Sequence, residues 1–374
     1  MFSTISNINL MRKQEAVAVS QNAVWMIGES TSSGNVSVST NAGTTWKSYS
    51  SGLSSVRGIA YGLTTGNTPL WVATGLLLGG GNISVSSNSG NTWTVITSIS
   101  MTSTIFCAAY GKNSSDQNLF MVGGSSTSGN IVLSSSNGTT WTGIMPATNT
   151  IMAIVSGITY GQLSSGTKVW IAVGVYKTGG PGVAYSSDGS TWSSVSAPLG
   201  YASNQLTSVS FGIDNAGNKR WVVSADMDAT TSPCVFTLIN PTDSTSFSTW
   251  SQAVSDLFMK GKSFSVAFGR GVSGNVWAIT GGLGSGNTIV TYDGSTSVGY
   301  ILADNNKYQG SQVGYLNTGS NATSRFYATH FYNSPSVPNK IAVSQNANSW
   351  ADINFNYKAY GNTVNGAIVS SLPY

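Results

Sequence analysis

SerThrAsnAlaGlyThrThrTrp, at positions 39 to 46, is a short polar segment that returns three more times almost unchanged. The other copies are SerSerAsnSerGlyAsnThrTrp (86 to 93), SerSerSerAsnGlyThrThrTrp (134 to 141) and TyrSerSerAspGlySerThrTrp (185 to 192). In each copy, Asn or Asp can accept hydrogen bonds from nearby backbone amides, and Gly adopts a positive φ at low cost. The tryptophan packs the segment against its own sheet. Each copy is therefore predicted to be a β-hairpin turn.

The tryptophans that end these segments are regularly spaced. The series is Trp46, Trp93, Trp141, Trp192, Trp250 and Trp350, with Ser297 where one further member is due. The steps are 47, 48, 51, 58, 47 and 53 residues, which is the period of a four-stranded propeller blade. Seven positions at this period predict an all-β, seven-bladed β-propeller with four-stranded antiparallel blades.

The later copies of the segment have diverged. ThrTyrAspGlySerThrSer (291 to 297) lacks the tryptophan, SerGlnAsnAlaAsnSerTrp (344 to 350) lacks the glycine, and the copy from Asp243 to Trp250 is longer. We assign a structural role to the residues that define the turns. They are Asn41, Gly43, Trp46, Asn88, Gly90, Trp93, Gly138, Trp141, Asp188, Gly189, Trp192 and Trp350.

A second repeat ends in an aromatic residue followed by glycine. It reads SerValArgGlyIleAlaTyrGly (55 to 62), IlePheCysAlaAlaTyrGly (105 to 111), ValSerGlyIleThrTyrGly (155 to 161), LeuThrSerValSerPheGly (206 to 212) and SerPheSerValAlaPheGly (263 to 269). Its small residues suit the innermost strands of the blades, which approach one another closely around a central channel. The apolar runs that follow, such as LeuTrpValAla (70 to 73), predict second strands that are buried on both faces.

The repeats divide the chain into an N-terminal arm (1 to 13), a propeller (14 to 354) and a C-terminal tail (355 to 374). The predicted blades span 14 to 50, 55 to 98, 104 to 146, 152 to 198, 205 to 254, 262 to 303 and 308 to 354. The segment from 14 to 20 is predicted to be the first inner strand. ValAsnGlyAlaIleValSer (364 to 370) resembles the inner-strand repeat. The tail therefore either closes the ring in the first blade or reaches a neighbouring chain.

The composition suits a folded β-protein with a neutral surface. Of the 374 residues 40% are hydrophobic, which argues against disorder, and only 7% are charged. The surface must then consist largely of Ser, Thr, Asn and Gly. Such a surface is typical of extracellular and virion β-proteins, so we expect the protein on the surface of a virion or another extracellular particle.

Charge and ligand types exclude several classes of function. The net charge is +4, but the basic residues are scattered, which predicts no nucleic-acid partner. The sequence shows neither a signal-peptide pattern nor an apolar run long enough for membrane insertion. With one histidine, His330, and two distant cysteines, Cys107 and Cys234, the sequence predicts no metal site, no cofactor and no disulfide.

The pattern Ser-x-Asp/Asn-x-Gly-x-Thr-Trp, with its shorter form SerSerAspGlySerThrTrp, resembles the Asp-box, or BNR repeat, of sialidase-like β-propellers. Four good copies and three diverged ones cover residues 14 to 354. The resemblance implies that these segments are peripheral structural turns, away from any catalytic centre. Neutral propellers of this kind also resemble proteins of virions and phage tails.

The resemblance does not extend to an active site. A sialidase-like hydrolase is expected to use three arginines around a carboxylate, a tyrosine activated by glutamate, and an aspartic acid. This chain has only two glutamates, Glu15 and Glu29, and its five arginines share no register. No catalytic residue is therefore assigned.

Another type of glycosidase needs only two carboxylates about 5 to 10 Å apart. Asp226 and Asp228 are the best pair, because alternate residues of an extended segment point the same way, toward a sugar or a Ca²⁺ ion. The alternative is a solvated turn in which these aspartates cap backbone amides. All tryptophans belong to the repeats, so Tyr176 and Tyr201 are the candidate sugar-stacking residues.

Leu76, Leu77 and Leu78 form an apolar run where other blades carry polar loops. They predict either a protein contact or an extension of the strand into the core. We therefore expect a non-enzymatic structural or interaction module that contacts neighbouring proteins or glycans. The alternative is a glycan-binding protein or a sialidase-like glycoside hydrolase. It would use carboxylates such as Asp226 and Asp228, on the face where the loops between second and third strands lie.

Overall fold

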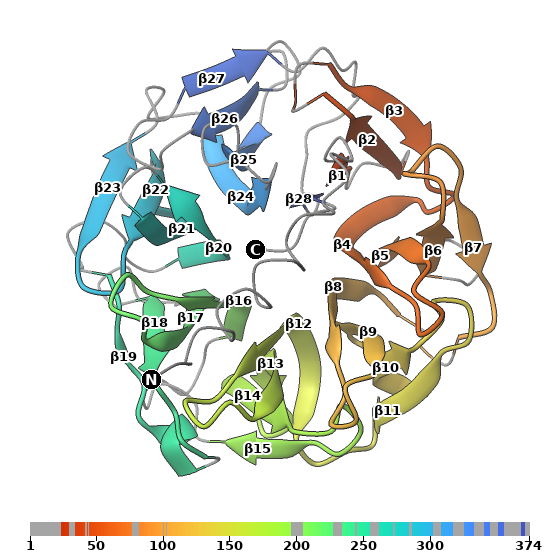
Figure 1. Ribbon diagram of the computed structural model, residues 1–374, viewed down its shortest axis with the longest axis horizontal. Coiled ribbons are helices and arrows are strands. Elements are labelled where there is room, and N and C mark those ends of the chain that lie inside the picture. The colour runs from red at the N-terminus through yellow and green to blue at the C-terminus, as the bar shows by residue number, and fades with distance from the viewer. Residues whose placement is uncertain are drawn as a thin grey trace, which may run out of the picture.

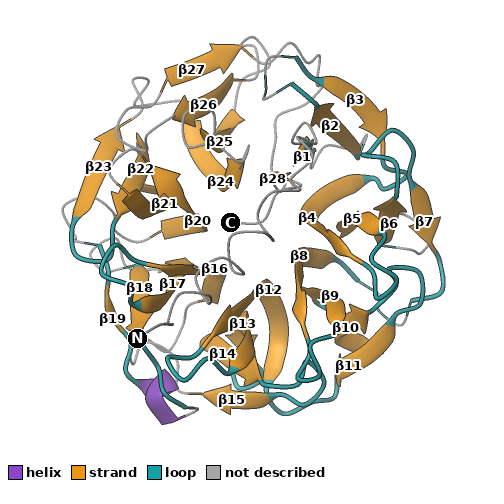
Figure 2. Ribbon diagram, in the orientation of Figure 1, coloured by secondary structure: helices purple, strands orange, loops and turns teal. Residues whose placement is uncertain are grey.

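The computed structural model describes most of the chain, and the strands it contains surround a common centre (Figure 1). The described residues are 24–29, 34–41, 43, 45–76, 82–99, 101, 103–195, 205–226, 234–243, 245–254, 262–271, 274–283, 286–301, 308–316, 325–332, 340–344, 351–354 and 368–370. Within these ranges the elements are β-strands apart from one 3-10 helix, η1 (Thr245–Ser248), as Figure 2 shows. The prediction of an all-β protein is confirmed.

The strands follow one another as four-stranded antiparallel blades. One blade consists of β4 (Ser55–Leu63), β5 (Pro69–Leu76), β6 (Ile83–Ser86) and β7 (Thr94–Ile96). The next consists of β8 (Ile105–Lys112), β9 (Asn118–Gly124), β10 (Asn130–Ser135) and β11 (Thr142–Pro146). A third consists of β12 (Met152–Gln162), β13 (Lys168–Tyr176), β14 (Pro181–Ser186) and β15 (Ser193–Val195). A fourth consists of β24 (Tyr308–Leu316), β25 (Arg325–Tyr332), β26 (Lys340–Ser344) and β27 (Ala351–Asn354). Four-stranded antiparallel blades were predicted, and these confirm them.

Two further blades join at one point. They are β16 (Gln205–Ile213), β17 (Lys219–Asp226), β18 (Val235–Ile239) and β19 (Ser251–Gln252), followed by β20 (Lys262–Gly271), β21 (Gly274–Leu283), β22 (Gly286–Tyr292) and β23 (Ser297–Ile301). The register pair of Asp226 with Lys262 links them into a single eight-stranded sheet. The other described blades form separate sheets, although isolated backbone contacts such as the Ser125–Ile154 bridge also link neighbouring blades.

The remaining sheet combines strands from both ends of the described chain. It contains β1 (Trp25–Gly28), β2 (Asn35–Ser39) and β3 (Lys47–Ser50), and β28 (Ile368–Ser370) pairs antiparallel with β1. The order is β28-β1-β2-β3, so β28 occupies the innermost place. The segment from 14 to 20 lies outside the described residues.

The innermost strands contact one another in sequence around the centre. β4 contacts β8, and the contacts continue through β12, β16, β20 and β24 to β28, which in turn contacts β4. The second strands pack on both neighbours. In β13, Val169 and Ile171 join a core cluster with β17, whereas Trp170 and Ala172 join one with β9. Burial on both faces explains why these strands are continuously apolar.

A repeated aromatic–glycine contact sets the spacing between inner strands. The aromatic residue of each inner strand lies against an aromatic residue of its own second strand, as in Phe211–Trp221, whose ring centroids are 4.6 Å apart. The same aromatic ring also occupies the space that a side chain would fill at the glycine of the preceding blade. A Cβ on Gly161 would lie 2.5 Å from Phe211 and 2.8 Å from Trp221. The same relation pairs Gly62 with Tyr110, Gly111 with Tyr160, Gly212 with Phe268 and Gly269 with Tyr315.

Serine side chains bond the free edges of the inner strands. Each inner strand has one edge without a strand partner, where backbone amides need acceptors. Ser208 Oγ accepts from the Val266 amide at 3.4 Å, and Ser210 Oγ accepts from the Phe268 amide at 3.1 Å. Ser265 Oγ accepts from the Val313 amide at 3.3 Å. The serines of the repeat therefore join consecutive blades as well as lying within them.

The predicted turn segments, which we call the box turns (39–46, 86–93, 134–141 and 185–192), share one hydrogen-bond pattern. A serine hydroxyl accepts the glycine amide at 2.8 to 2.9 Å in all four turns. The Asn or Asp oxygen accepts the amide of the threonine that precedes tryptophan, at 2.7 to 3.0 Å. The glycines have φ of 76 to 79°. In three turns the indole donates to the glycine carbonyl at 2.9 to 3.1 Å. Trp350 lies outside the described residues.

We expect Gly161→Ala to lower the free energy of unfolding by about 1–3 kcal/mol, because its Cβ would overlap the Phe211 and Trp221 rings. Urea denaturation followed by tryptophan fluorescence measures this. Gly66→Ala is the control, because its Cβ would meet only Thr64 Oγ1, at 3.7 Å. In a Phe211→Leu background the cost of Gly161→Ala should fall, and an unchanged cost would show that the ring contact does not limit the spacing.

The carboxylate of Asp188 should make its box turn sensitive to acid. Burial raises the pKa of Asp188, but hydrogen bonds from Thr191, Ser190 and Ser186 outweigh it, so the pKa is lowered overall. The folded-state pKa is below the unfolded value, so the stabilisation is present above about pH 3.9 and is lost as pH falls through the folded pKa.

We expect Asp188→Ala to cost about 1–2 kcal/mol near neutral pH, because two backbone amides lose their acceptor. Asp188→Asn should stay within about 0.5 kcal/mol of the parent, because Asn137 fills the same role in the preceding box turn. Stability measured from pH 7 down to pH 3 should fall less steeply for Asp188→Asn than for the parent. Equal slopes would contradict this role for the carboxylate.

Candidate functional site

Every described inner strand that pairs over its full length has a β-bulge near its first residues. The register with the second strand shifts between Val56 and Gly58, between Ile105 and Cys107, and at matching places farther along the chain. The bulged residues are Arg57, Phe106, Ser156, Thr207, Phe264 and Ser311, and β12 has a second one at Ala153. We call this level of the ring the rim. Bulges redirect side chains and are frequent beside binding sites.

Arg57 and Phe106 form a pair across two blades at the rim. The Arg57 guanidinium carbon lies 5.7 Å from the centroid of the Phe106 ring, within cation–π range. Arg57 is exposed and Phe106 is half-buried. The covered part of the Arg57 side chain lowers its pKa from the ordinary value, but an arginine remains charged near neutral pH.

The Arg57 guanidinium retains its hydrogen-bonding capacity. Among the described residues it forms neither a hydrogen bond nor an ion pair, and the ring contact with Phe106 is its recorded interaction. A cation–π contact uses none of the guanidinium N–H groups as hydrogen-bond donors, so these groups remain available. This arrangement suits an external acceptor, such as a carboxylate, or the hydroxyls of a sugar beside an aromatic ring.

Thr207, another bulged residue of the rim, forms hydrogen bonds between neighbouring blades. Thr207 Oγ1 donates to the Ser263 carbonyl at 2.8 Å and is 2.8 Å from Ser224 Oγ. Ser263 Oγ in turn donates to the Cys234 carbonyl at 2.7 Å. Thr207 therefore joins the β16–β19 and β20–β23 blades, and Arg57 differs from it in having no such polar bond among the described residues.

The described binding candidates from the sequence lie at the rim, but on different blades. Leu76, Tyr176 and Asp226 each end a second strand, opposite the first residue of the inner strand. Leu76 is the last residue of β5 and is half-buried. Leu77, Leu78, Tyr201 and Asp228 lie outside the described residues.

Tyr176 is held by its own blade. Its hydroxyl is 3.1 Å from the Val183 carbonyl and also bonds to the Val195 carbonyl. Burial raises its pKa, and the bond to Val183 opposes that rise. Only the half-buried ring remains for a ligand contact.

The described carboxylates at the rim are far apart in the blade order. Glu29 follows β1 and is 1% exposed, with Ser37 Oγ donating to it at 3.2 Å. Asp226 ends β17 and is half-buried. Asp188 and Asp293 lie in turns that join third and fourth strands, at the opposite ends of the blades, where backbone amides bind them. A pair of described carboxylates on one blade is not found at the rim.

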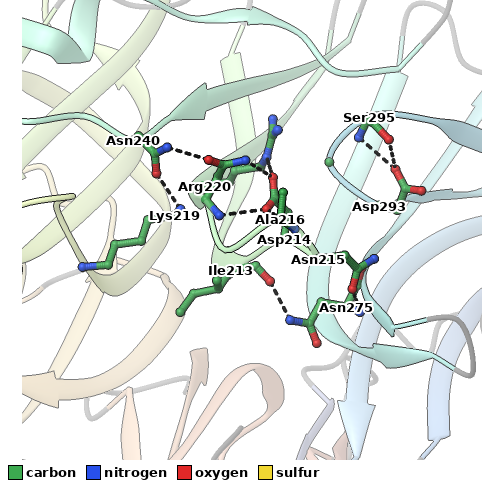
Figure 3. Close-up of polar contacts among 12 residues, drawn as sticks. Ile213, Asp214, Asn215, Ala216, Lys219, Arg220, Asn240, Asn275, Asp293 and Ser295 are labelled. Carbon is green, nitrogen blue, oxygen red and sulfur yellow. Dashed lines mark hydrogen bonds and ion pairs between the residues drawn. The ribbon is translucent and has the colours of Figure 1, made fainter.

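The opposite face holds a cluster that the sequence did not reveal (Figure 3). Asp214 and Arg220, at the two ends of the β16–β17 turn, form an ion pair with 2.6 Å between Oδ2 and Nε, and their side chains are 4% and 8% exposed. Burial raises the Asp214 pKa, but bonds from Asn218 and Arg220 lower it overall. The sequence signal that could have indicated this ion pair was Arg220, a charged residue at the start of an apolar strand.

Two sequence expectations concern residues elsewhere in the fold. Cys107 and Cys234 are not joined in a disulfide, and burial raises the pKa of Cys107 to about 12. His330 lies within β25, which continues to Tyr332. Over the described ranges there is neither a cluster of three potential metal ligands nor a helix long and apolar enough to cross a membrane.

Comparisons with known proteins identify the fold. No family model matches the chain, and no curated protein sequence matches it. Among solved structures, BP39L lectin from Burkholderia pseudomallei is similar, with a TM-score of 0.63, 14% identity, and coverage of 89% of this chain and 95% of the lectin. A GH74 enzyme from Niastella koreensis has a TM-score of 0.55 and 14% identity, with 87% of this chain and 52% of the enzyme covered.

A third similar structure is the Dos1 propeller, with a TM-score of 0.52, 12% identity, and 82% of this chain and 73% of that chain covered. The present chain corresponds to about half of the GH74 enzyme's length. These similarities, at low identity, concern the fold. Together with the four-stranded blades around a common centre, they show that this protein has a β-propeller fold.

Proposed function

We propose that the protein is a non-enzymatic binding module whose rim contacts a glycan through Arg57 and Phe106. The observation that carries this proposal is an exposed arginine, stacked on an aromatic ring and without a described acceptor, at the rim of the ring. An aromatic face covers the apolar side of a sugar, and guanidinium N–H groups bind hydroxyl or carboxylate oxygens. The lectin with a similar fold is compatible with this proposal.

The proposed scaffold is a seven-bladed ring closed by its C-terminal strand. The closed sequence of contacts among β4, β8, β12, β16, β20, β24 and β28 supports seven blades. The pairing of β28 with β1 supports the ring-closing alternative for the tail. A closed ring holds the residues of the rim at fixed relative positions, which favours a preorganised binding surface.

The neutral surface and the Asp-box resemblance support a place on a virion or another extracellular particle. There the protein would contact neighbouring proteins as well as glycans. Leu76, with Leu77 and Leu78 beyond it in the sequence, is the proposed protein contact. Purified particles that lack the chain would contradict the placement without affecting the glycan proposal.

A glycan array probed with the purified protein tests the binding role. We expect specific binding that weakens roughly tenfold in Arg57→Gln, the loss that removing one charge-assisted contact gives. Phe106→Leu should weaken it further when combined with Arg57→Gln. Arg270→Gln is the matched control, because Arg270 is exposed near the other end of an inner strand. An array without specific binding, or binding unchanged in Arg57→Gln, would contradict the proposal.

The hydrolase alternative rests on Asp226 and Asp228. If it held, the bound glycans would be cleaved, and Asp226→Asn with Asp228→Asn would abolish cleavage while leaving the thermal unfolding temperature unchanged. We expect no cleavage by the parent protein over hours at pH 4 to 8, measured by chromatography of reducing-end-labelled oligosaccharides. Cleavage that these two substitutions abolish would replace the binding-module proposal with the hydrolase.

A further inference from the structure

Arg220 replaces an apolar residue of the blade repeat. The register that pairs Gly212 with Arg220 pairs Leu316 with Arg325, but it pairs Gly62 with Leu70, Gly111 with Leu119, Gly161 with Val169 and Gly269 with Val276. These apolar residues are buried, at 1 to 9% exposure. Leu119 supports the next box turn, because a Cβ on Gly189 would lie 2.8 Å from Leu119 Cδ2. Arg220 therefore places a cation where consecutive blades normally meet through apolar contacts.

Asp214 neutralises this cation and keeps the role of a turn residue. Its Oδ2 accepts from Arg220 Nε at 2.6 Å and from Asn218 Nδ2 at 2.9 Å. Its Oδ1 accepts the amides of Ala216 and Asn218 at 2.9 and 2.8 Å. Asn113 makes the same two amide bonds in the β8–β9 turn, at 2.9 and 3.0 Å. The carboxylate thus differs from the usual turn residue in its charge.

The turn that receives Arg220 (291–297) is one of the diverged copies and lacks the box tryptophan. By register, Tyr292 stands opposite Trp277, whereas a serine stands opposite the tryptophan in three other blades, as Ser186 does opposite Trp170. Arg220 Nη1 donates to the Tyr292 hydroxyl at 3.2 Å, and that hydroxyl donates to the Gly294 carbonyl at 3.0 Å. A Cβ on Gly294 would lie 2.7 Å from Asp214 Cβ. The two departures from the repeat therefore meet at one joint.

A buried ion pair gives little net stability, because desolvation offsets the attraction, but breaking it costs much. The other box turns offer no tyrosine hydroxyl at this position, so Arg220 would lose a partner beneath any of them. Similar blades are prone to pair in the wrong order or with another chain. A pairing that penalises every partner but one gives specificity without added affinity.

We propose that Asp214, Arg220 and Tyr292 form a pairing key that makes the β16–β19 blade accept the β20–β23 blade and reject the others. The key acts during folding, when the blades compete for neighbours. The bonds of Thr207 and Ser263 and the Asp226–Lys262 register pair then complete the same joint on the rim side. This inference is independent of the glycan proposal.

The test is the double variant Asp214→Asn with Arg220→Leu. It gives this joint the residue types that the β8–β11 blade has at the same two positions, Asn113 and Leu119. Turn bonds and an apolar contact are both retained, so the urea midpoint of the double variant should equal or exceed that of the parent. The yield of monomer on refolding should nevertheless fall at least twofold, with misassembled oligomers seen by size-exclusion chromatography. A yield equal to the parent's, or a loss of yield matched by a lower midpoint, would overturn the proposal.

Two further variants separate specificity from stability. Asn113→Asp with Leu119→Arg moves the ion pair to a joint whose box turn has Ser186 in place of tyrosine, so its urea midpoint should fall well below the parent's. Tyr292→Phe keeps the ring against Trp277, whose centroid is 6.0 Å away, and removes only the hydroxyl. It should lower the monomer yield by less than the double variant does. A transplanted pair that leaves the midpoint unchanged would show that any joint accepts it, and would also overturn the key.

Discussion

The contact between an aromatic ring and a glycine of the preceding blade sets the distance between inner strands, and most other features of the ring depend on that distance. Phe211 lies against Trp221 within its own blade and over Gly161 of the blade before it. Because a Cβ at Gly161 would overlap both rings, no other residue permits this approach. At this spacing a serine hydroxyl reaches the next strand's free amides, as Ser210 reaches Phe268. Dense packing and satisfied edge amides thus have one cause.

The rim is the level at which this regular packing is interrupted. A bulge near the start of each inner strand redirects one side chain, and its identity is not fixed by packing against the second strand. Thr207 uses the position to join two blades, whereas Arg57 turns toward Phe106 and retains unused donors. The scaffold therefore fixes the position of the rim residues but not their chemistry, and similar folds occur in a lectin and in a GH74 enzyme.

The sequence predicted those features that repeat and have local causes. The box turns followed from Asn41, Gly43 and their counterparts because the hydrogen bonds close within about five residues. Arg57 and Phe106 were not predicted as a pair, because they are 49 residues apart and meet through a bulge that no local pattern marks. The ion pair of Asp214 and Arg220 was not predicted for another reason. Only the strand register shows that Arg220 occupies the position that Leu119 has in the β8–β11 blade.

The register positions of β24 and β28 depart from the aromatic–glycine repeat. By register, Leu316 stands opposite Arg325 where Gly62 stands opposite Leu70, so a leucine occupies the glycine position. Ser370 stands opposite Trp25 where Tyr61 stands opposite Trp71, so a serine occupies the aromatic position. The large and small residues have exchanged places between the two strands. At this register position each of the other described inner strands has an aromatic residue, so Ser370 distinguishes the sequence of β28 from all of them.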